Sequence, residues 1–278
     1  MHHDIRLFQL NDIAGALELC RNAGWNQLAS DWARLIEYEP TACFVMNDGK
    51  KIIGTVTTTC YGTQLAWIGM MLVHEKYRRQ GIAKALIKTC LEHLHSRKIR
   101  CIKLDATPAG KLVYSQLGFR DEWSFHRWQR EGDAREGDAR DDGNPAVVPE
   151  SDAGWNLDLD KAAFGVERGQ WLKRLANHSR VKRFREGCGM VREGYLASYI
   201  GPVIASNPKT AKYIINDLLA STNRPTFWDI PQPNHNAITL AHDCGFRPVR
   251  ILTRMWTGPE LSQCNLDLQY AISDPGTG

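Results

Sequence analysis

The order of hydrophobic and polar positions divides the first 130 residues into short strands and amphipathic helices. Alternating or β-branched runs predict strands, and apolar positions spaced three and four apart predict helices. Asn47-Asp48-Gly49 lies between two strand-like runs and indicates a hairpin turn. We expect strands at 5–10, 42–46, 51–59, 65–73, 100–104 and 123–128, and helices at 12–20, 31–38, 83–95 and 111–117. This order predicts a mixed α/β fold.

The pattern changes after Arg130, where the stretch REGDAREGDA begins. Its high charge and low apolar content are typical of a flexible linker or an exposed loop. We therefore predict a first domain at 1–130, a linker at 131–152 and a second domain at 153–278.

The second half of the chain repeats the pattern of the first with parts missing. Three segments match: 199–205 with 67–73, 227–229 with 103–105, and 234–246 with the helix that ends at Gly118-Phe119. Ala241 stands where the first copy has Tyr114. The connection from the first matching strand to its helix is also shorter in the second copy and lacks arginines. We expect a degenerate copy of the first domain.

Composition excludes several classes of protein. The net charge is +4 and no long Lys/Arg run occurs, which argues against a nucleic-acid partner. The eight cysteines show no CxxC or zinc spacing, so we expect reduced thiols and no metal. The first residues lack the features of a signal peptide, and no run of about 18 apolar residues could cross a membrane. These observations predict a cytoplasmic protein without a membrane partner.

The stretch from Leu65 to Ala85 carries the clearest chemistry. An apolar strand leads through a basic turn into the start of a helix, where unpaired backbone N–H groups and the helix dipole attract anions. Arg78 and Arg79 add charge, and Gly81 lets the backbone close around an oxyanion. We expect a phosphate or pyrophosphate at this turn.

These residues resemble a known motif. Arg78 to Ala83, RRQGIA, is similar to the R/Q-x-x-G-x-G/A loop of the GCN5-related N-acetyltransferase (GNAT) superfamily, and Tyr114 to Phe119 is similar to its Tyr-x-x-x-Gly-Phe signature. The stretch from Asp160 to Arg168 is similar to the start of the C-terminal domain of two-domain GNAT relatives. The resemblance implies two GNAT-like folds in tandem, the second degenerate.

The resemblance also implies acetyl-CoA as co-substrate, bound by the first domain. Its pyrophosphate is expected on the turn, and its pantetheine arm along the preceding strand, where Gly69 is the expected bulge. Thr107 occupies the position of an asparagine that contacts the pantetheine in many relatives. The cofactor-binding residues implied are Met71, Leu72, Val73, Arg78, Arg79, Gln80, Gly81, Ile82, Ala83, Thr107 and Tyr114.

The implied reaction is direct attack of a primary amine on the thioester in a ternary complex. Tyr114 matches the superfamily tyrosine that protonates the departing thiolate, although a core tyrosine is the alternative. The backbone N–H of Met71 is expected at the oxyanion. The strand contains no carboxylate, so Asp105 is the predicted base, with a helix cap or turn as an equal alternative.

The acceptor is expected to be a small-molecule or peptide amine, bound by a monomer or homodimer. Asp31 and Glu37 are weaker choices for the base that could instead attract a cationic substrate. The second domain could line the pocket through Trp228, Asp229, His235 and Asn236. The alternative to an N-acetyltransferase is an acyl-CoA-binding sensor with little turnover.

Overall fold

The computed structural model describes residues 4–132, 155–261 and 264–278, which form two compact units. The first unit contains the chain up to Glu122 together with Thr253–Glu260 and Pro275–Gly278. The second contains Trp123–Leu252 and Leu261–Asp274. Most of the predicted linker, residues 133–152, lies outside the described residues.

The units are not contiguous halves because two long strands each contribute to both. Strand β6 (Arg120–Arg130) pairs with β10 (Thr226–Pro231) in the second unit, and the end of β11 (Arg247–Thr257) pairs with β5 (Cys101–Ala106) in the first. The predicted boundary at residue 130 differs because the apolar side chain of Trp128 is buried in the core of the second unit. Each unit is thus completed by a strand from the other half of the sequence.

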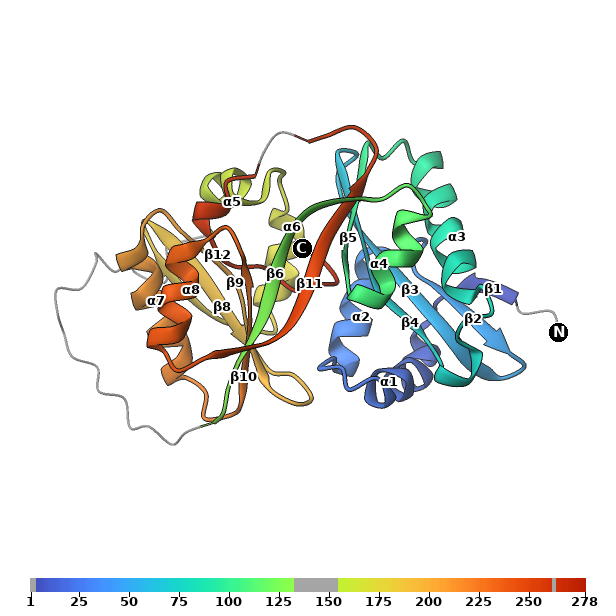
Figure 1. The fold of residues 1–278 in the computed structure, drawn as a ribbon, viewed down its shortest axis with the longest axis horizontal. Helices are drawn as coiled ribbons and strands as arrows, with labels where there is room; N and C mark the ends of the chain where they lie inside the picture. Colours follow the sequence, from blue (N-terminus) through green and yellow to red (C-terminus); the bar gives the residue numbers. More distant parts are fainter. Residues whose placement is uncertain (1–3, 133–154, 262–263) are drawn as a thin grey trace. The chain divides into compact units, whose positions relative to one another are not determined.

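The first unit follows the predicted order of elements (Figure 1). Its sheet runs β1-β2-β3-β4-β5-β11, antiparallel except for the parallel pair β4 and β5. The elements not yet given are β1 (Asp4–Leu7), α1 (Ile13–Asn22), α2 (Ala29–Tyr38), β2 (Phe44–Asp48), β3 (Lys51–Tyr61), β4 (Leu65–Val73), α3 (Ile82–Ser96) and α4 (Pro108–Ser115), with short 3₁₀ turns η1 (Leu10–Asp12) and η2 (Glu75–Tyr77). This confirms the predicted α/β class.

The core of the first unit lies between α3 and one face of the sheet. The apolar stripe of α3 predicted from its spacing is buried at Leu86, Ile87, Cys90 and Leu94. Burial of such side chains contributes roughly 1.5–3 kcal/mol each, so this face fixes α3 on the sheet. The start of α3, which carries the predicted anion site, is held in place by Ile82 in the same core.

The bulge of β4 lies one residue beyond the predicted position. Gly69 pairs with Thr57, and the register then shifts so that Met70 and Met71 both lie opposite Val56. Met70, within the bulge, has a left-handed φ of 49°. Gly69 has a different reason to be glycine, because a Cβ there would lie 2.6 Å from the Cα of Gly276.

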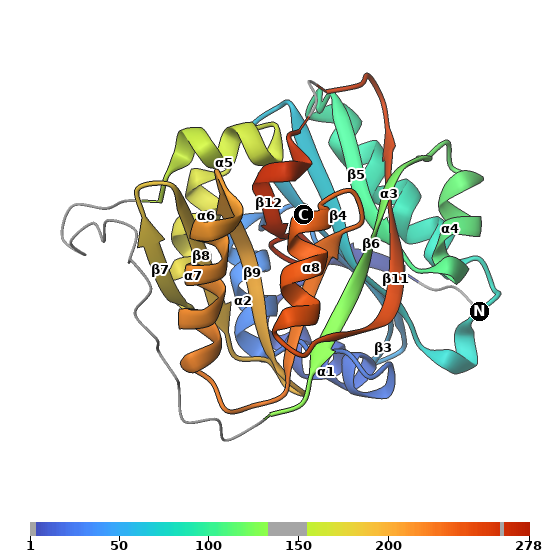
Figure 2. The ribbon, with the colours of Figure 1, turned by 60° about the vertical axis from the view of Figure 1, so that its left-hand side comes forward.

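The second unit repeats this plan with its own sheet, β7-β8-β9-β10-β6. Figure 2 shows α7 lying across β7, β8 and β9. Its further elements are α5 (Leu157–Phe164), α6 (Gly169–Ala176), β7 (Arg180–Phe184), β8 (Gly187–Arg192), β9 (Ser198–Ala205), α7 (Pro208–Ala220), α8 (His235–Asp243), η3 (Leu266–Leu268) and β12 (Gln269–Ala271). The matching segments found in the sequence therefore occupy matching elements.

Strand β12 distinguishes the second unit from the first. Beyond its short parallel pairing with β10, β9 is paired with β12 at Val203 and Ile204. The carbonyl of Tyr270, in β12, accepts a hydrogen bond of 2.7 Å from Trp228 Nε1. The chain itself thus fills the place where β9 and β10 separate.

None of the helices in the described ranges is long and apolar enough to cross a membrane. The eight cysteines are free thiols in the structure, and six of them are buried.

Candidate active site

The predicted anion turn forms a single exposed loop between β4 and α3. Arg79 and Gly81 adopt left-handed φ values of 62° and 82°, and Gly81 is the N-cap of α3. No side chain caps this helix, so its first N–H groups point to solvent without a side-chain acceptor. Arg78, Arg79 and Gln80 are exposed, whereas the Ile82 side chain is buried and contributes only its backbone. The loop therefore offers backbone donors and two guanidinium groups to an anion.

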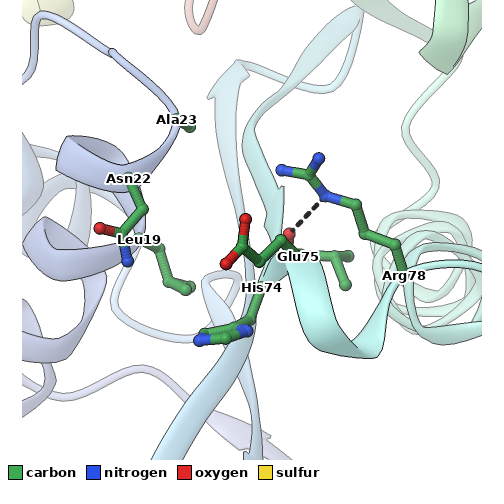
Figure 3. Close-up of a pocket in the computed structure, with 7 residues that line it drawn as sticks. Leu19, Asn22, Ala23, His74, Glu75 and Arg78 are labelled. Carbon is green, nitrogen blue, oxygen red and sulfur yellow. Dashed lines mark hydrogen bonds between the residues drawn. The ribbon is translucent and has the colours of Figure 1, made fainter.

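The start of the loop is ordered by local contacts (Figure 3). Arg78 Nε donates to the carbonyl of Val73 over 3.2 Å, and the amide of Lys76 donates to His74 Nδ1 over 3.2 Å. His74 also packs edge-on against Tyr77. A small pocket lies between this segment and the end of α1, lined by Leu19, Asn22, Ala23, Val73, His74, Glu75 and Arg78. These contacts leave the rest of the Arg78 guanidinium available.

The edge of β4 opens beside the loop. β4 and β5 pair only from Leu65 to Ile68, so the stretch from Met71 to Val73 is not paired with β5. In the second unit the matching residues, Val203 and Ile204, pair with β12. The position predicted for a pantetheine arm in the first unit is thus one at which the same fold accepts a strand.

Tyr114 belongs to the apolar cluster under α3 and packs edge-on against Phe119. Burial raises the pKa of its phenol to about 12. Within the described residues its hydroxyl has no hydrogen-bond partner. The side chain is therefore a protonated donor at neutral pH whose hydroxyl is not engaged by the protein.

Thr107, predicted near the pantetheine, caps α4 by accepting from the amide of Gly110 over 3.2 Å. Capping α4 is a structural reason for a threonine at position 107 that requires no ligand. The cap also shows that Asp105 is not the residue that begins this helix.

Asp105 lies in a buried ion pair that the sequence analysis did not anticipate. Its two oxygens accept hydrogen bonds of 2.9 and 3.0 Å from Arg254 on β11. The carboxylate is fully buried and the Arg254 side chain is 3% exposed. The guanidinium also lies 4.3 Å from the centre of the Trp67 ring. Both oxygens of Asp105 are therefore already occupied by donors.

The second unit contains the same arrangement. Asp229 accepts hydrogen bonds of 2.8 and 2.6 Å from Arg127 on β6, and the Arg127 guanidinium lies 5.6 Å from the centre of the Tyr199 ring. Asp229 and Tyr199 match Asp105 and Trp67 in the sequence repeat. The sequence repeat contains a signal for these arginines. An arginine lies eight positions after the Phe of each Gly-Phe pair, Arg127 after Phe119 and Arg254 after Phe246.

The predicted acceptor residues are not brought together within either unit. In the first unit, Asp31 accepts from the amide of Leu28 and pairs with Arg34 at the start of α2, and Glu37 is exposed on the same helix. In the second unit, the expectation that Trp228 lines a pocket is wrong, because its side chain is fully buried in the hydrophobic core. His235 and Asn236 are exposed at the start of α8.

In the described part of the second unit, the connection from β9 to α7 is no counterpart of the anion loop. Ser206 and Asn207 alone connect β9 to α7, and the Asn207 side chain accepts from the amide of Thr210 over 2.9 Å. A side chain of the protein therefore occupies one of the helix-terminal donors, whereas no side chain does so at the start of α3.

Two stretches of the chain match family models described as acetyltransferase (GNAT) domains, residues 39–121 and residues 157–270. The chain is 25% identical over 238 residues to a protein described as the uncharacterized N-acetyltransferase YitH of Bacillus subtilis (strain 168). The match covers 83% of this chain and 82% of that protein.

Solved structures show the same architecture. A putative acetyltransferase from Pyrococcus horikoshii matches with a TM-score of 0.85 and 25% identity, over 99% of this chain and 96% of that one. A tandem GNAT protein from the clavulanic acid biosynthesis pathway matches with a TM-score of 0.65 and 15% identity. This match covers 94% of this chain and 100% of that one. The fold is thus shared across its whole length, both units included.

Proposed function

Because the chain is an acetyltransferase of the GNAT superfamily with two such domains in tandem, we propose that its first unit transfers an acetyl group from acetyl-CoA to a primary amine. One observation carries this assignment to the first unit. The start of α3 is uncapped and flanked by Arg78 and Arg79, whereas the start of α7 is capped by Asn207. Only the first of these helix termini offers its N–H groups to a pyrophosphate.

The residues present fit the co-substrate. We propose that the backbone from Arg78 to Ala83 holds the pyrophosphate, because left-handed Arg79 and Gly81 curve the loop ahead of an open helix terminus. The stretch from Met71 to Val73 would hold the pantetheine amides as an added strand does. The pairing of β12 with Val203 and Ile204 supports this, because a strand binds at the matching place in the second unit. On this proposal, β12 takes the place that a second pantetheine would need.

Acetyl-CoA, when bound, supplies an activated acetyl thioester. We propose that the backbone N–H of Met71, within the bulge, donates to the carbonyl oxygen as negative charge develops on it. Tyr114 would give its proton to the departing thiolate, since burial keeps the phenol protonated at neutral pH, and solvent would return a proton to the phenolate as the new amide nitrogen releases its excess proton. Holding donor and amine together supplies much of the remaining acceleration.

The role of Asp105 as base stays a prediction, and the ion pair favours a different role. Both of its oxygens are held by Arg254, and Asp229 makes the same pair in the unit without an anion loop. A feature common to both units serves the fold rather than the transfer. We propose that Asp105 positions the strands and that the acceptor amine loses its proton to solvent before attack.

The first test is isothermal titration of the full chain with acetyl-CoA. We expect one site per chain, abolished in the double variant Arg78→Glu/Gly81→Asp. Lys209→Glu, which reverses one charge at the start of α7 as Arg78→Glu does at the anion loop, is the control and should leave binding unchanged. Two sites per chain, or binding that survives the double variant, would contradict the assignment to the first unit.

The second test separates an enzyme from an acyl-CoA-binding sensor. Tyr114→Phe should lower kcat about a hundredfold or more, as loss of a general acid does, and leave acetyl-CoA affinity unchanged. Tyr195→Phe, at an exposed tyrosine of the second unit, should change neither. A sensor would show no turnover with any amine in the wild type and no effect of Tyr114→Phe.

A further inference from the structure

A cluster of largely covered charged side chains extends from the Arg127–Asp229 pair of the second unit. It lies around Tyr199, on the face of the sheet opposite α7 and α8, and draws on β6, β8, β10 and β11. We refer to it as the arginine cluster, and its charged members are Arg127, Arg192, Arg250, Asp229 and Asp274.

Two of its three arginines are satisfied by the protein. Arg127 donates to both oxygens of Asp229, which also accepts from the Tyr199 hydroxyl over 2.9 Å. Arg192 donates to the carbonyls of Gly201 and Ser273 over 2.7 and 2.9 Å and to Asp274 over 3.2 Å. These two guanidinium groups need no further partner.

Arg250 is the exception. Its Nε is buried and has no hydrogen-bond partner within the described part of the chain. Burial and the neighbouring charge of Arg127 lower the pKa of Arg250, while Asp229 and Tyr199 act in the opposite direction. A buried guanidinium donor without an acceptor is unfavourable, because desolvation of the charge is not offset.

The charges of the cluster do not balance. Three guanidinium groups stand against two carboxylates, so one positive charge is left without a counter-ion among these residues. A single negative charge would neutralise it. Two rings belong to the same cluster, since the Arg127 guanidinium lies 5.0 Å from the centre of Phe227 and the Arg192 guanidinium 4.5 Å from that of Tyr199.

Two side chains at the site are not fully covered. Arg250 and Phe227 are each partly exposed although the Arg250 Nε is covered. A planar guanidinium recognises a planar carboxylate with two parallel hydrogen bonds, and a carboxylate carries the single charge that the cluster lacks. A phosphate would carry more charge than the cluster leaves unbalanced.

We propose that the second unit binds a small monocarboxylate at Arg250, beside the Arg127–Asp229 pair and the rings of Tyr199 and Phe227. The site lies wholly within the second unit and depends neither on the anion loop nor on acetyl transfer. It gives the second unit, which lacks the loop, a ligand of its own.

The test is a saturation-transfer NMR titration of the full chain with acetate, observed through its methyl protons and repeated with inorganic phosphate as a competitor, at constant ionic strength. All proteins carry Arg78→Glu/Gly81→Asp, which removes the anion loop as a second site. We expect saturable acetate binding that weakens at least tenfold in Arg250→Gln. Arg250→Lys keeps the charge without the planar fork and should fall between the two.

Arg247→Gln is the matched control, because Arg247 lies on the same strand but is 72% exposed and pairs only at 3.4 Å with Glu131. It should bind acetate like its parent. Circular dichroism checks that each variant is folded. If Arg250→Gln is unfolded, the weaker acetate binding expected of Arg250→Lys relative to its parent is the test. No saturable acetate binding, equal binding in Arg250→Gln, or tighter binding of phosphate than of acetate would each overturn the proposal.

Discussion

Replacing Asp105 by asparagine tests whether the buried pair with Arg254 serves the fold or the chemistry. The carboxylate is fully buried, its partner is 3% exposed, and the two are joined by hydrogen bonds of 2.9 and 3.0 Å. Asparagine removes the charge and one acceptor, which leaves a buried guanidinium uncompensated. Breaking such a pair on one side costs roughly 3–5 kcal/mol. Asp229→Asn should cost a similar amount in the second unit, since Asp229 is fully buried and Arg127 is 13% exposed.

Hydrogen exchange followed by mass spectrometry assigns the loss to one unit. Amides of β5 and of Thr253–Thr257 should exchange about a hundredfold to several thousandfold faster in Asp105→Asn, with β10 unaffected, and Asp229→Asn should show the reverse. An Asp105→Leu/Arg254→Met double variant should recover much of the loss, because an apolar pair leaves no charge unpaired. The pH dependence of kcat/KM should keep its shape in Asp105→Asn. Unchanged exchange together with a lost pH dependence would refute this reasoning and make Asp105 the base.

Three further outcomes follow from the structure. Gly69→Ala should displace Gly276 and lower the free energy of unfolding of the first unit by about 1–3 kcal/mol in urea denaturation. An unchanged free energy would show that Gly276 does not pack against Gly69. The free energy of unfolding should be constant up to about pH 8.5 and fall above pH 9, because burial raises the pKa of Cys43 to about 12 and only the unfolded thiol ionises in this range. One such thiol lowers the free energy of unfolding by about 1.4 kcal/mol per pH unit. Urea midpoints measure this, and a free energy of unfolding that rises with pH would contradict it. Asn207→Ala should cost about 1 kcal/mol through the lost cap on Thr210, seen as faster exchange in α7, and an unchanged rate would mean that the cap contributes nothing.

Local patterns in the sequence predicted those parts of the fold that depend on neighbouring residues. The bounds of β4, Leu65–Val73, coincide with the prediction, and the apolar stripe of α3 is buried as its spacing indicated. The anion loop followed from residues adjacent in the chain. In each case the residues that determine the structure lie within one or two turns or strands of one another.

The parts that could not be predicted depend on pairing between distant segments. Arg254 lies 149 positions from Asp105, and nothing local in either segment shows that β11 returns to pair with β5. The bulge at Met70 was placed one residue early because the reason for Gly69 is a contact with Gly276, again far along the chain. Trp228 was misjudged because aromatic residues occur in both cores and pockets.

Because β11 contributes to the first unit, the sheet of that unit cannot be completed until β11 has been translated. When β5 leaves the ribosome, the strand that completes its sheet is still about 150 residues away, a delay of roughly 8–30 s at ordinary translation rates. During that interval the edge of β5 has no partner and Asp105 lacks its guanidinium. Chaperone engagement and ribosome profiling pauses should therefore concentrate between the emergence of residues 106 and 257, and an N-terminal half expressed alone should aggregate through that edge.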